Sequence, residues 1–347
     1  MPPEQPVLLE VNNLKKYFPL RHGLFGRGGG TVKAVDGLTF HIQRGETLGL
    51  VGESGSGKTT AGRTVLRAFN PTEGEIIFRL PTGENVDLAK LSKDDLRAMR
   101  RHAQMIFQDP YSSLNPRMTV RDIIAEPLVA GGVARGAEVD DRVRETAMRC
   151  QLSLEHLRRY PHAFSGGQRQ RIGIARALVV RPQFVVCDEP VSALDVSIQA
   201  QILNLLMDMQ KELGLTYLFI AHDLSVVEHV SDRVAVMYLG RLVELAPTQA
   251  LFYKPLHPYA EALMSAIPDL DPDEVMKPVM LEGEIPSPAN PPSGCHFHPR
   301  CPYAQDVCKQ ETPEWKEYRP GHFALCHFAD QLELKGAIKS GAAASAN

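Results

Sequence analysis

A glycine-rich stretch near residue 55 has the residue types and spacing of a loop that binds phosphate groups. It is Gly52-Glu53-Ser54-Gly55-Ser56-Gly57-Lys58-Thr59, which matches the pattern G-x-x-x-x-G-K-[ST]. Glycines let backbone N–H groups approach phosphates, Lys58 supplies a cation for the β- and γ-phosphates, and the Thr59 hydroxyl can ligate Mg²⁺. We therefore predict that the segment from Gly52 to Thr60 binds a nucleotide; the alternative is a chance glycine-rich turn.

Two neighbouring carboxylates follow the apolar run Phe184 to Cys187. Asp188 stands where a Mg²⁺-holding acid is needed in an ATPase with a phosphate loop. Glu189 is then placed to accept a proton from the attacking water. The alternative is a pair of acids that end a strand at a surface turn, but the phosphate loop upstream favours ATP hydrolysis.

A second stretch suited to phosphate is Ser165-Gly166-Gly167-Gln168, which precedes a segment rich in arginine and alanine. A helix that begins without bulky side chains presents its backbone N–H groups and its partial positive charge to an anion. One chain does not need two such sites for one nucleotide. Two protomers that face each other head to tail would use both, whereas the alternative is a flexible turn before a helix.

Four of the six cysteines are concentrated near the C-terminal end in the pattern C-x5-C-x6-C-x17-C; they are Cys295, Cys301, Cys308 and Cys326. In a reducing compartment such a group indicates a metal or cluster site before it indicates disulfides. Four thiolates can hold Zn²⁺ or an iron–sulfur cluster. Zinc sites usually contain C-x2-C pairs, which are absent here, but nearby histidines keep zinc open: His296, His298, His322 and His327. Four unligated cysteines in a packed segment are the third possibility.

The elements around these residues alternate in the way typical of an α/β sheet with crossover helices. A short apolar strand, 47–51, precedes the phosphate loop and a helix, 59–69, follows it. Helical spacing at 119–129, 139–150 and 168–179 predicts a helical insert over about 110–181. Strands then return at 184–187, 216–220 and 233–238, and a helix over 197–213 is ended by Gly214.

Composition limits what the chain can do and where it can act. The net charge is −3 and no basic excess is present, so nucleic acid is not expected as a partner. No apolar stretch approaches the roughly 18 to 20 residues that cross a bilayer, and residues 1–10 do not form a signal peptide, so we expect a cytoplasmic protein. We place a main domain at 1–268, a C-terminal extension at 269–335 and a disordered tail at 336–347.

The stretch Phe164-Ser165-Gly166-Gly167-Gln168, together with the phosphate loop and the acidic strand end, resembles the signature of the ABC transporter ATPases. The resemblance implies an α/β fold, the P-loop NTPase core of an ABC ATPase, with a β-rich N-terminal part, a helical subdomain and a small Cys-containing appendage. It implies roles for Gln108 as a sensor of Mg²⁺ and the γ-phosphate, and for His222 as a γ-phosphate contact. It also makes Ser192 to Asp195 the loop between the two ATP sites.

The same resemblance implies an aromatic side chain that stacks on adenine, for which Tyr17 and Phe18 are the candidates. Spacing favours Phe18, and plain core packing is the alternative. All catalytic motifs are intact, so we expect hydrolysis with Lys58, Glu189 and His222 as catalytic residues. We expect ATP and Mg²⁺ as cofactors, with Thr59, Gln108 and Asp188 around the Mg²⁺.

Further segments are similar to the dipeptide and oligopeptide importer ATPases: 107–116, 159–171, 188–196, 256–259 and the cysteine region. This branch implies a 4Fe–4S cluster at the four cysteines, a paralogous or identical ATPase partner, two transmembrane permease subunits and, indirectly, a substrate-binding protein. It implies a peripheral position at the cytoplasmic face of the bacterial inner membrane. Import of glutathione, a nickel chelate or a sugar is the alternative, followed by a non-transport ABC ATPase or a subunit that binds nucleotide without hydrolysing it.

Overall fold

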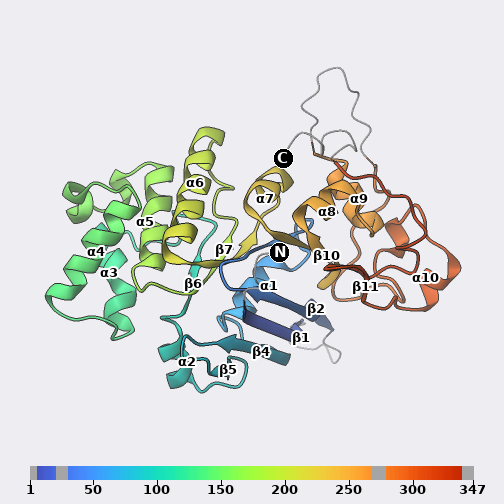
Figure 1. Ribbon diagram of the computed structural model, residues 1–347, viewed down its shortest axis with the longest axis horizontal. Coiled ribbons are helices and arrows are strands. Elements are labelled where there is room, and N and C mark those ends of the chain that lie inside the picture. The colour runs from blue at the N-terminus through green and yellow to red at the C-terminus, as the bar shows by residue number, and fades with distance from the viewer. Residues whose placement is uncertain (1–5, 21–29, 268–278, 338–347) are drawn as a thin grey trace, which may run out of the picture.

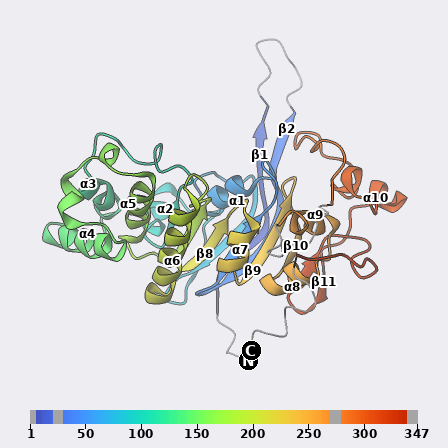
Figure 2. The ribbon, with the colours of Figure 1, turned by 90° about the horizontal axis from the view of Figure 1, so that it is seen from above.

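The computed structural model describes residues 6–20, 30–267 and 279–337. Figure 1 shows three regions side by side: a helical block, a central region of two sheets, and a C-terminal extension on the opposite side. Figure 2 shows the same order from above, with the extension and the helical block at opposite ends of the central sheet. Among the described helices, none combines the length and the apolar character that a membrane crossing requires.

The N-terminal part forms an antiparallel sheet in the order β2-β1-β4-β5. Its strands are β1 (Val7–Pro19), β2 (Thr31–Gln43), β4 (Glu73–Arg79) and β5 (Asn85–Asp87). Leu9 and Val11 of β1 and Phe78 of β4 are fully buried and belong to one core with Leu48 and Leu50 of the central sheet. This burial holds the N-terminal sheet against the element that leads into the phosphate loop.

The central sheet has eight strands in the order β11-β12-β10-β9-β3-β8-β7-β6. Five of them run parallel: β6 (Ala103–Ile106), β7 (Phe184–Asp188), β8 (Thr216–Ile220), β3 (Thr47–Val51) and β9 (Arg233–Tyr238). Every residue of β3, β7 and β8 is buried, as expected for parallel strands covered on both faces. The residues that follow β3, β6, β7 and β8 therefore meet at one edge of the sheet.

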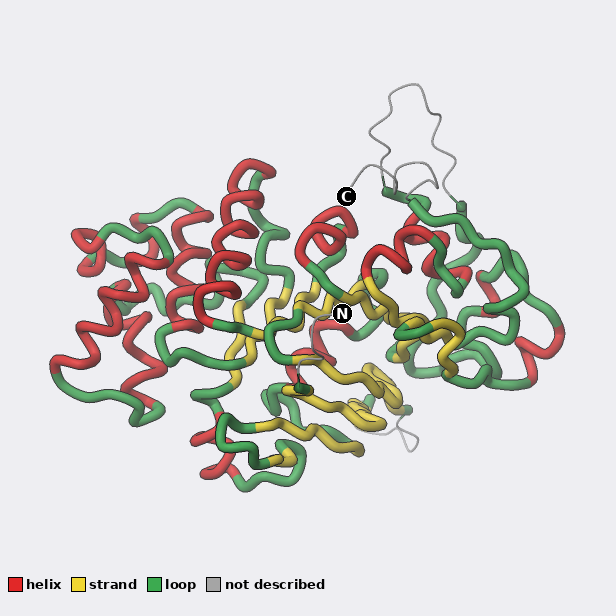
Figure 3. Tube along the Cα trace, viewed as in Figure 1, coloured by secondary structure: helices red, strands yellow, loops and turns green. Residues whose placement is uncertain are grey.

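The helical block contains α3 (Val120–Ala130), α4 (Ala137–Arg149) and α5 (Gly166–Leu178), with short 3-10 turns at Leu154–Arg158 and Pro161–Ala163. Figure 3 shows these helices gathered beyond the last parallel strand. The predicted helices at 119–129, 139–150 and 168–179 are confirmed within two residues at each end. Their apolar residues form one core with α6 (Val196–Leu213), which ends at Gly214 as predicted, in a left-handed conformation with φ of 63°.

The helix after the phosphate loop is shorter than predicted. It is α1 (Lys58–Val65), whereas the expected range was 59–69. The φ of Arg67 is 55°, which an α-helix cannot accommodate, so the chain leaves the helix before Phe69. Phe69 is then free to pack edge-on against Phe18, with ring centroids 5.6 Å apart.

The other helices that the structure describes before the extension are α2 (Lys93–Met99), α7 (Leu224–Val230), α8 (Thr248–Tyr253) and α9 (Pro258–Met264). The C-terminal extension contributes a 3-10 turn (His298–Arg300), α10 (Asp306–Gln310), β11 (Lys316–Arg319) and β12 (His322–Ala324). The boundary proposed near residue 268 and the tail beyond residue 337 lie outside the described residues.

The extension continues the central sheet. Its β12 pairs antiparallel with β10 (Arg241–Pro247) at the outer side of β9. Beside this junction the buried Glu244 carboxylate faces His322 Nε2 at 2.6 Å and accepts the backbone N–H groups of Leu256 and His257, each at 2.8 Å. A buried carboxylate is stable only when such partners replace water, so the extension is built into the core.

Candidate nucleotide site

The phosphate loop is held in a shape that requires glycine at two positions. Gly52 has φ of 149° and Gly57 has φ of 105°. A Cβ atom at Gly52 would lie 2.1 Å from the Met237 carbonyl oxygen, and one at Gly57 would lie 2.1 Å from the Ala34 carbonyl oxygen. Both approaches are far below van der Waals contact, so only glycine lets the loop close over its site.

The interior of the loop is lined by polar groups. Lys58 Nζ donates to the carbonyl oxygens of Gly52 at 2.6 Å and Glu53 at 3.0 Å, so the ammonium group lies within the curve of the loop. Burial lowers the pKa of Lys58, while the carboxylates of Glu189, Asp188 and Glu53 act in the opposite direction. The buried Ser56 Oγ has no hydrogen-bond partner among the residues the structure describes, which suits a loop shaped for an anion.

Thr59 and Asp188 meet beside the loop. Thr59 Oγ1 donates to Asp188 Oδ1 at 2.8 Å, and the Asp188 side chain is fully buried. The second oxygen, Asp188 Oδ2, lacks a hydrogen-bond partner within the described part of the chain and lies 3.7 Å from Arg63 Nη2. Burial raises the pKa of Asp188. Mg²⁺ prefers oxygen ligands such as a hydroxyl and a carboxylate, so the side chains of Thr59 and Asp188 fit this metal.

The Glu189 side chain contacts residues that follow the two neighbouring strands. Its Oε2 accepts a hydrogen bond from Gln108 Nε2 at 2.7 Å and lies 3.2 Å from His222 Nδ1. Gln108 follows β6, Glu189 follows β7 and His222 follows β8. Glu189 has φ of 47°, a conformation that non-glycine residues rarely adopt, and its N–H is held by the Ile220 carbonyl at 2.9 Å. The structure thus gathers the three predicted residues around one carboxylate.

The Ser165 to Gln168 stretch begins α5 with a reciprocal cap. Ser165 Oγ accepts the Gln168 N–H at 3.4 Å, and Gln168 Oε1 accepts the Ser165 N–H at 3.1 Å. Ser165 is exposed, and Figures 1 and 2 both show α5 within the helical block, apart from α1. A Cβ atom at Gly167 would lie 2.5 Å from Ile198 Cγ2, so this helix start packs closely on α6.

The predicted loop between ATP sites lies directly after Glu189. Ser192 Oγ donates to the Glu189 carbonyl at 3.1 Å, and the Asp195 side chain accepts the Ile198 N–H and begins α6. The loop is therefore tied to Glu189 at one end and to α6, the helix that contacts Gly167, at the other.

The two aromatic candidates for adenine lie at successive positions of β1, so their side chains leave opposite faces. The Tyr17 hydroxyl donates to Asp36, which is also bonded to Arg241 at 2.8 Å. Phe18 packs against Phe69, and Lys16 Nζ lies 4.8 Å from the centre of its ring. The hydroxyl of Tyr17 thus makes a polar contact within the fold.

The four C-terminal cysteines line one small cavity. None is in a disulfide. Burial raises the pKa of Cys301 to about 11 and that of Cys326 to about 12, and the neighbouring thiols add to the rise. No group of three or more His, Cys, Asp or Glu in the described ranges is arranged to hold a metal ion as it stands. The chemistry of the four thiols fits a thiophilic metal or cluster, although their present spacing does not form a coordination sphere.

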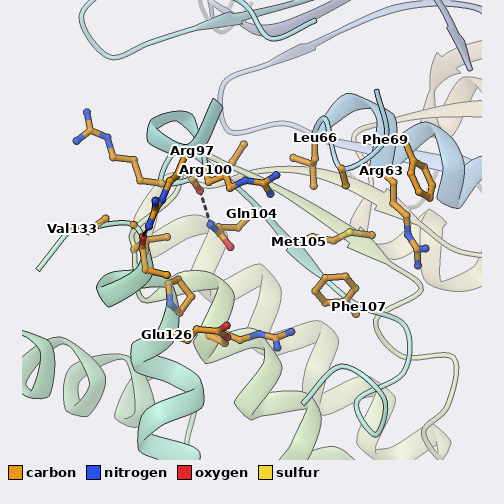
Figure 4. A pocket seen from close by; sticks show the side chains of 18 residues that line it. Arg63, Leu66, Phe69, Arg97, Arg100, Gln104, Met105, Phe107, Glu126 and Val133 are labelled. Carbon is orange, nitrogen blue, oxygen red and sulfur yellow. Dashed lines mark hydrogen bonds between the residues drawn. The ribbon is translucent and has the colours of Figure 1, made fainter. Parts of the chain in front are cut away.

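Two functional features were not foreseen from the sequence. Arg300 of the extension donates to Glu53 of the phosphate loop, 247 positions earlier in the chain, and no local pattern signals this contact. In addition, a groove of about 830 Å³ lies between α1, α2, β6 and α3. Figure 4 shows Arg100, Gln104 and Phe107 among the side chains at this groove, and Phe107 directly precedes Gln108.

This fold, with a glycine-rich loop beside the buried Asp188 and the Gln108–Glu189–His222 group, defines a nucleotide-binding cassette. The family model described as "ABC transporter" matches residues 35–192, and the one described as "Oligopeptide/dipeptide transporter, C-terminal region" matches residues 243–308. The chain belongs to the ABC transporter ATP-binding proteins, in their oligopeptide and dipeptide branch. The predicted family and fold class are confirmed.

Individual relatives agree along nearly the whole chain. The "Oligopeptide transport ATP-binding protein AppF" of Bacillus subtilis is 54% identical, over 93% of this chain and 98% of the relative. A "Putative peptide import ATP-binding protein" of Brucella ovis is 53% identical, over 92% of this chain and 97% of the relative. The solved structure described as "Dimeric structure of a post-hydrolysis state of the ATP-binding cassette MJ0796 bound to ADP and Pi" is 27% identical, with a TM-score of 0.60, covering 70% of this chain and 99% of that one.

Proposed function

We propose that this chain hydrolyses ATP and thereby powers the import of peptides through a membrane transporter. The observation that carries the proposal is the convergence of the phosphate loop, the buried Asp188 and the Gln108–Glu189–His222 group at one edge of the sheet. The names of the relatives, which describe oligopeptide transport and peptide import, support peptides as the cargo.

The residues of this edge have separate roles in the proposal. Lys58 and the loop N–H groups from Gly52 to Thr60 bind the triphosphate, while Thr59, Asp188 and Gln108 hold Mg²⁺. The metal supplies positive charge to the transferring phosphate. Glu189 takes the proton of the attacking water, and His222 holds the γ-phosphate. Phe18 is the proposed adenine-stacking residue, as its spacing from the phosphate loop favours, while the hydroxyl of Tyr17 is bound to Asp36.

The second half of each ATP site comes from a partner subunit in this proposal. The start of α5, from Ser165 to Gln168, lies apart from the phosphate loop of its own chain. It presents the backbone N–H groups of Gly166 and Gly167, since those of Ser165 and Gln168 are bonded in the cap. A head-to-tail pair would place this helix start over the nucleotide of the neighbouring subunit. The dimeric cassette with 27% identity supports such a pair. We propose a related ATPase chain as the partner, with a second copy as the alternative.

The groove beside α3 is the proposed docking site for a permease subunit. Five arginines and one glutamate contribute to its lining, so it suits an acidic helix or loop; these arginines are Arg63, Arg97, Arg100, Arg101 and Arg176. Phe107 in the lining of the groove directly precedes Gln108, whose side-chain amide donates to Glu189. An occupant that moves Phe107 would therefore shift Gln108, whose amide is bonded to Glu189, the proposed general base. Two permeases would hold the pair of ATPases at the cytoplasmic face of the bacterial inner membrane, with a substrate-binding protein outside.

Purification of the chain from membranes of its host is expected to yield two multi-span permeases. Arg100→Glu should weaken this association about tenfold or more, because an acidic occupant would face a like charge. Arg158→Glu is the matched control, since Arg158 is exposed on the helical block and outside the groove. Uptake of labelled peptide by the complex in vesicles tests the cargo. Retention of the permeases by the Arg100→Glu variant would contradict the docking site, and uptake restricted to a non-peptide solute would contradict the cargo.

The cysteine cavity of the extension, which we propose spans 269–335, is assigned a 4Fe–4S cluster held by Cys295, Cys301, Cys308 and Cys326. Protein purified without air is expected to be brown and to contain iron and sulfide. Cys301→Ser should lose most of both, whereas Cys150→Ala, in the helical block, should retain them. A colourless anaerobic preparation without iron and sulfide would reject the cluster, and one that contains Zn²⁺ instead would establish the alternative metal.

A further inference from the structure

Glu53 places a negative charge within a loop that is shaped for anions. Its carboxylate receives two hydrogen bonds from Arg300, from Nη1 to Oε2 at 2.7 Å and from Nη2 to Oε1 at 3.1 Å. This two-pronged geometry is the strongest form of an arginine–carboxylate pair. Only 8% of Arg300 is exposed, so water screens the pair weakly.

Arg300 reaches the loop from a rigid part of the extension. It ends the 3-10 turn His298–Arg300, which lies between Cys295 and Cys301, and its N–H donates to the Phe297 carbonyl at 3.0 Å. The buried Phe297 ring packs against Tyr238 and Tyr259, at centroid distances of 5.2 Å and 5.4 Å. The turn therefore cannot shift without disturbing this aromatic cluster.

The same cluster also holds the backbone of Glu53. The Glu53 N–H donates to the Tyr259 hydroxyl at 2.7 Å, and Tyr259 is fully buried. The Arg300 guanidinium lies 6.0 Å from the centre of the Tyr238 ring. Both the main chain and the side chain of this loop residue are thus fixed by one group of residues, to which the extension contributes Arg300 and Phe297.

We propose that Arg300 is a positioning residue for ATP binding: by neutralising Glu53 it lets the phosphate loop accept the triphosphate. The cysteine-bearing segment that carries Arg300 would thereby set the affinity for the nucleotide. This inference rests on the proposed function, because it requires that the loop binds ATP.

The proposed effect of Arg300 on ATP binding is electrostatic. A carboxylate without a cation in this loop would repel the phosphates, because like charges raise the free energy of binding at short range. Lys58 already bonds to the Glu53 carbonyl at 3.0 Å. Loss of Arg300 would free the Glu53 side chain to compete with ATP for the Lys58 ammonium. A purely structural ion pair would instead stabilise the extension and leave ATP affinity unchanged.

The test is a calorimetric titration of ATP into the full chain. The parent and all variants contain Glu189→Gln, so that ATP is not consumed. Arg300→Gln is expected to raise the Kd for ATP about tenfold, because Glu53 is then uncompensated. Adding Glu53→Gln to that variant should return the Kd to within about threefold of the parent, since the repelling charge is gone. Arg300→Lys, which keeps the charge but not the two-pronged geometry, should give an intermediate value.

Arg233→Gln is the matched control. It breaks another poorly exposed arginine–glutamate pair, Arg233–Glu46 at 3.0 Å, which does not contact the loop, so the Kd for ATP should remain that of the parent. An Arg300→Gln variant that binds ATP like the parent, or a double variant as weak as Arg300→Gln, would overturn the proposal. If Arg300→Gln does not fold, the Arg300→Lys and double variants decide in the same way. A parent that does not bind ATP would contradict the proposed function instead.

Discussion

Replacing Glu189 by Gln is expected to reduce ATP turnover about 100-fold or more, the usual contribution of a general base. The carboxamide cannot accept the proton of the attacking water, while the phosphate loop and Asp188 remain as they are. ATP affinity should therefore stay within about threefold of the parent, since the loss falls on the chemical step. Steady-state hydrolysis and equilibrium ATP binding, measured on the same preparation, separate the two effects.

The matched control for this substitution is Glu75→Gln, at an exposed position of β4, where the carboxylate pairs with Lys90 at 2.8 Å. It removes the same charge by the same change and should leave turnover unaffected. If the Glu189→Gln variant kept turnover near the parent value, Glu189 would not be the general base. A loss of ATP binding as large as the loss of turnover would show that Glu189 serves the loop rather than the water.

The parts of the site that the sequence predicts are those encoded within a few consecutive residues. The phosphate loop needs glycine where a Cβ atom would strike the carbonyl oxygens of Met237 and Ala34, and this need produces a recognisable spacing. The apolar run before Asp188 likewise reflects a strand buried on both faces. Because parallel strands end at one edge, Gln108, Glu189 and His222 could be expected together before their contacts were seen.

Features that depend on distant residues had no such signal. The Arg300–Glu53 pair joins positions 247 apart, and the extension reaches the loop through tertiary contacts such as the packing of Phe297 on Tyr238 and Tyr259. The composition change near residue 268 suggested a separate appendage, yet β12 continues the central sheet across it. The length of α1 was overestimated for a local reason, since a single residue with positive φ, Arg67, ends a segment whose composition is still helical.

The groove beside α3 is also formed by residues that lie far apart in the sequence. Its arginines come from α1, α2 and α5 and from the turn after α2, so no continuous stretch of the sequence contains them all. The net charge of −3 conceals this local concentration, because acids on other surfaces balance it. Whole-chain charge cannot reveal a small basic surface made by folding.

Replacing Ser165 by Arg tests whether the two halves of the ATP site belong to different subunits. Ser165 is exposed at the start of α5, apart from the phosphate loop of its own chain. The substitution should therefore leave ATP binding by the isolated subunit within about threefold of the parent but lower turnover about 100-fold, as expected when oriented donors are lost from the reacting phosphate. Ser153→Arg, at another exposed helix start of the same block, adds the same charge and should change neither quantity.

The decisive form of this test uses two inactive variants that share one preparation. A Lys58→Ala subunit keeps its Ser165 to Gln168 stretch, and a Ser165→Arg subunit keeps its phosphate loop. In a head-to-tail pair of copies, one mixed site combines the intact loop of the second subunit with the intact helix start of the first, so mixing should restore turnover that neither variant shows alone. If each site lay within a single chain, both subunits would remain inactive in the mixture, because a defect in either half could not be supplied by the neighbour. Recovery on mixing therefore measures the shared site itself, and its absence in a preparation shown to contain mixed dimers would contradict an active head-to-tail pair of copies of this chain.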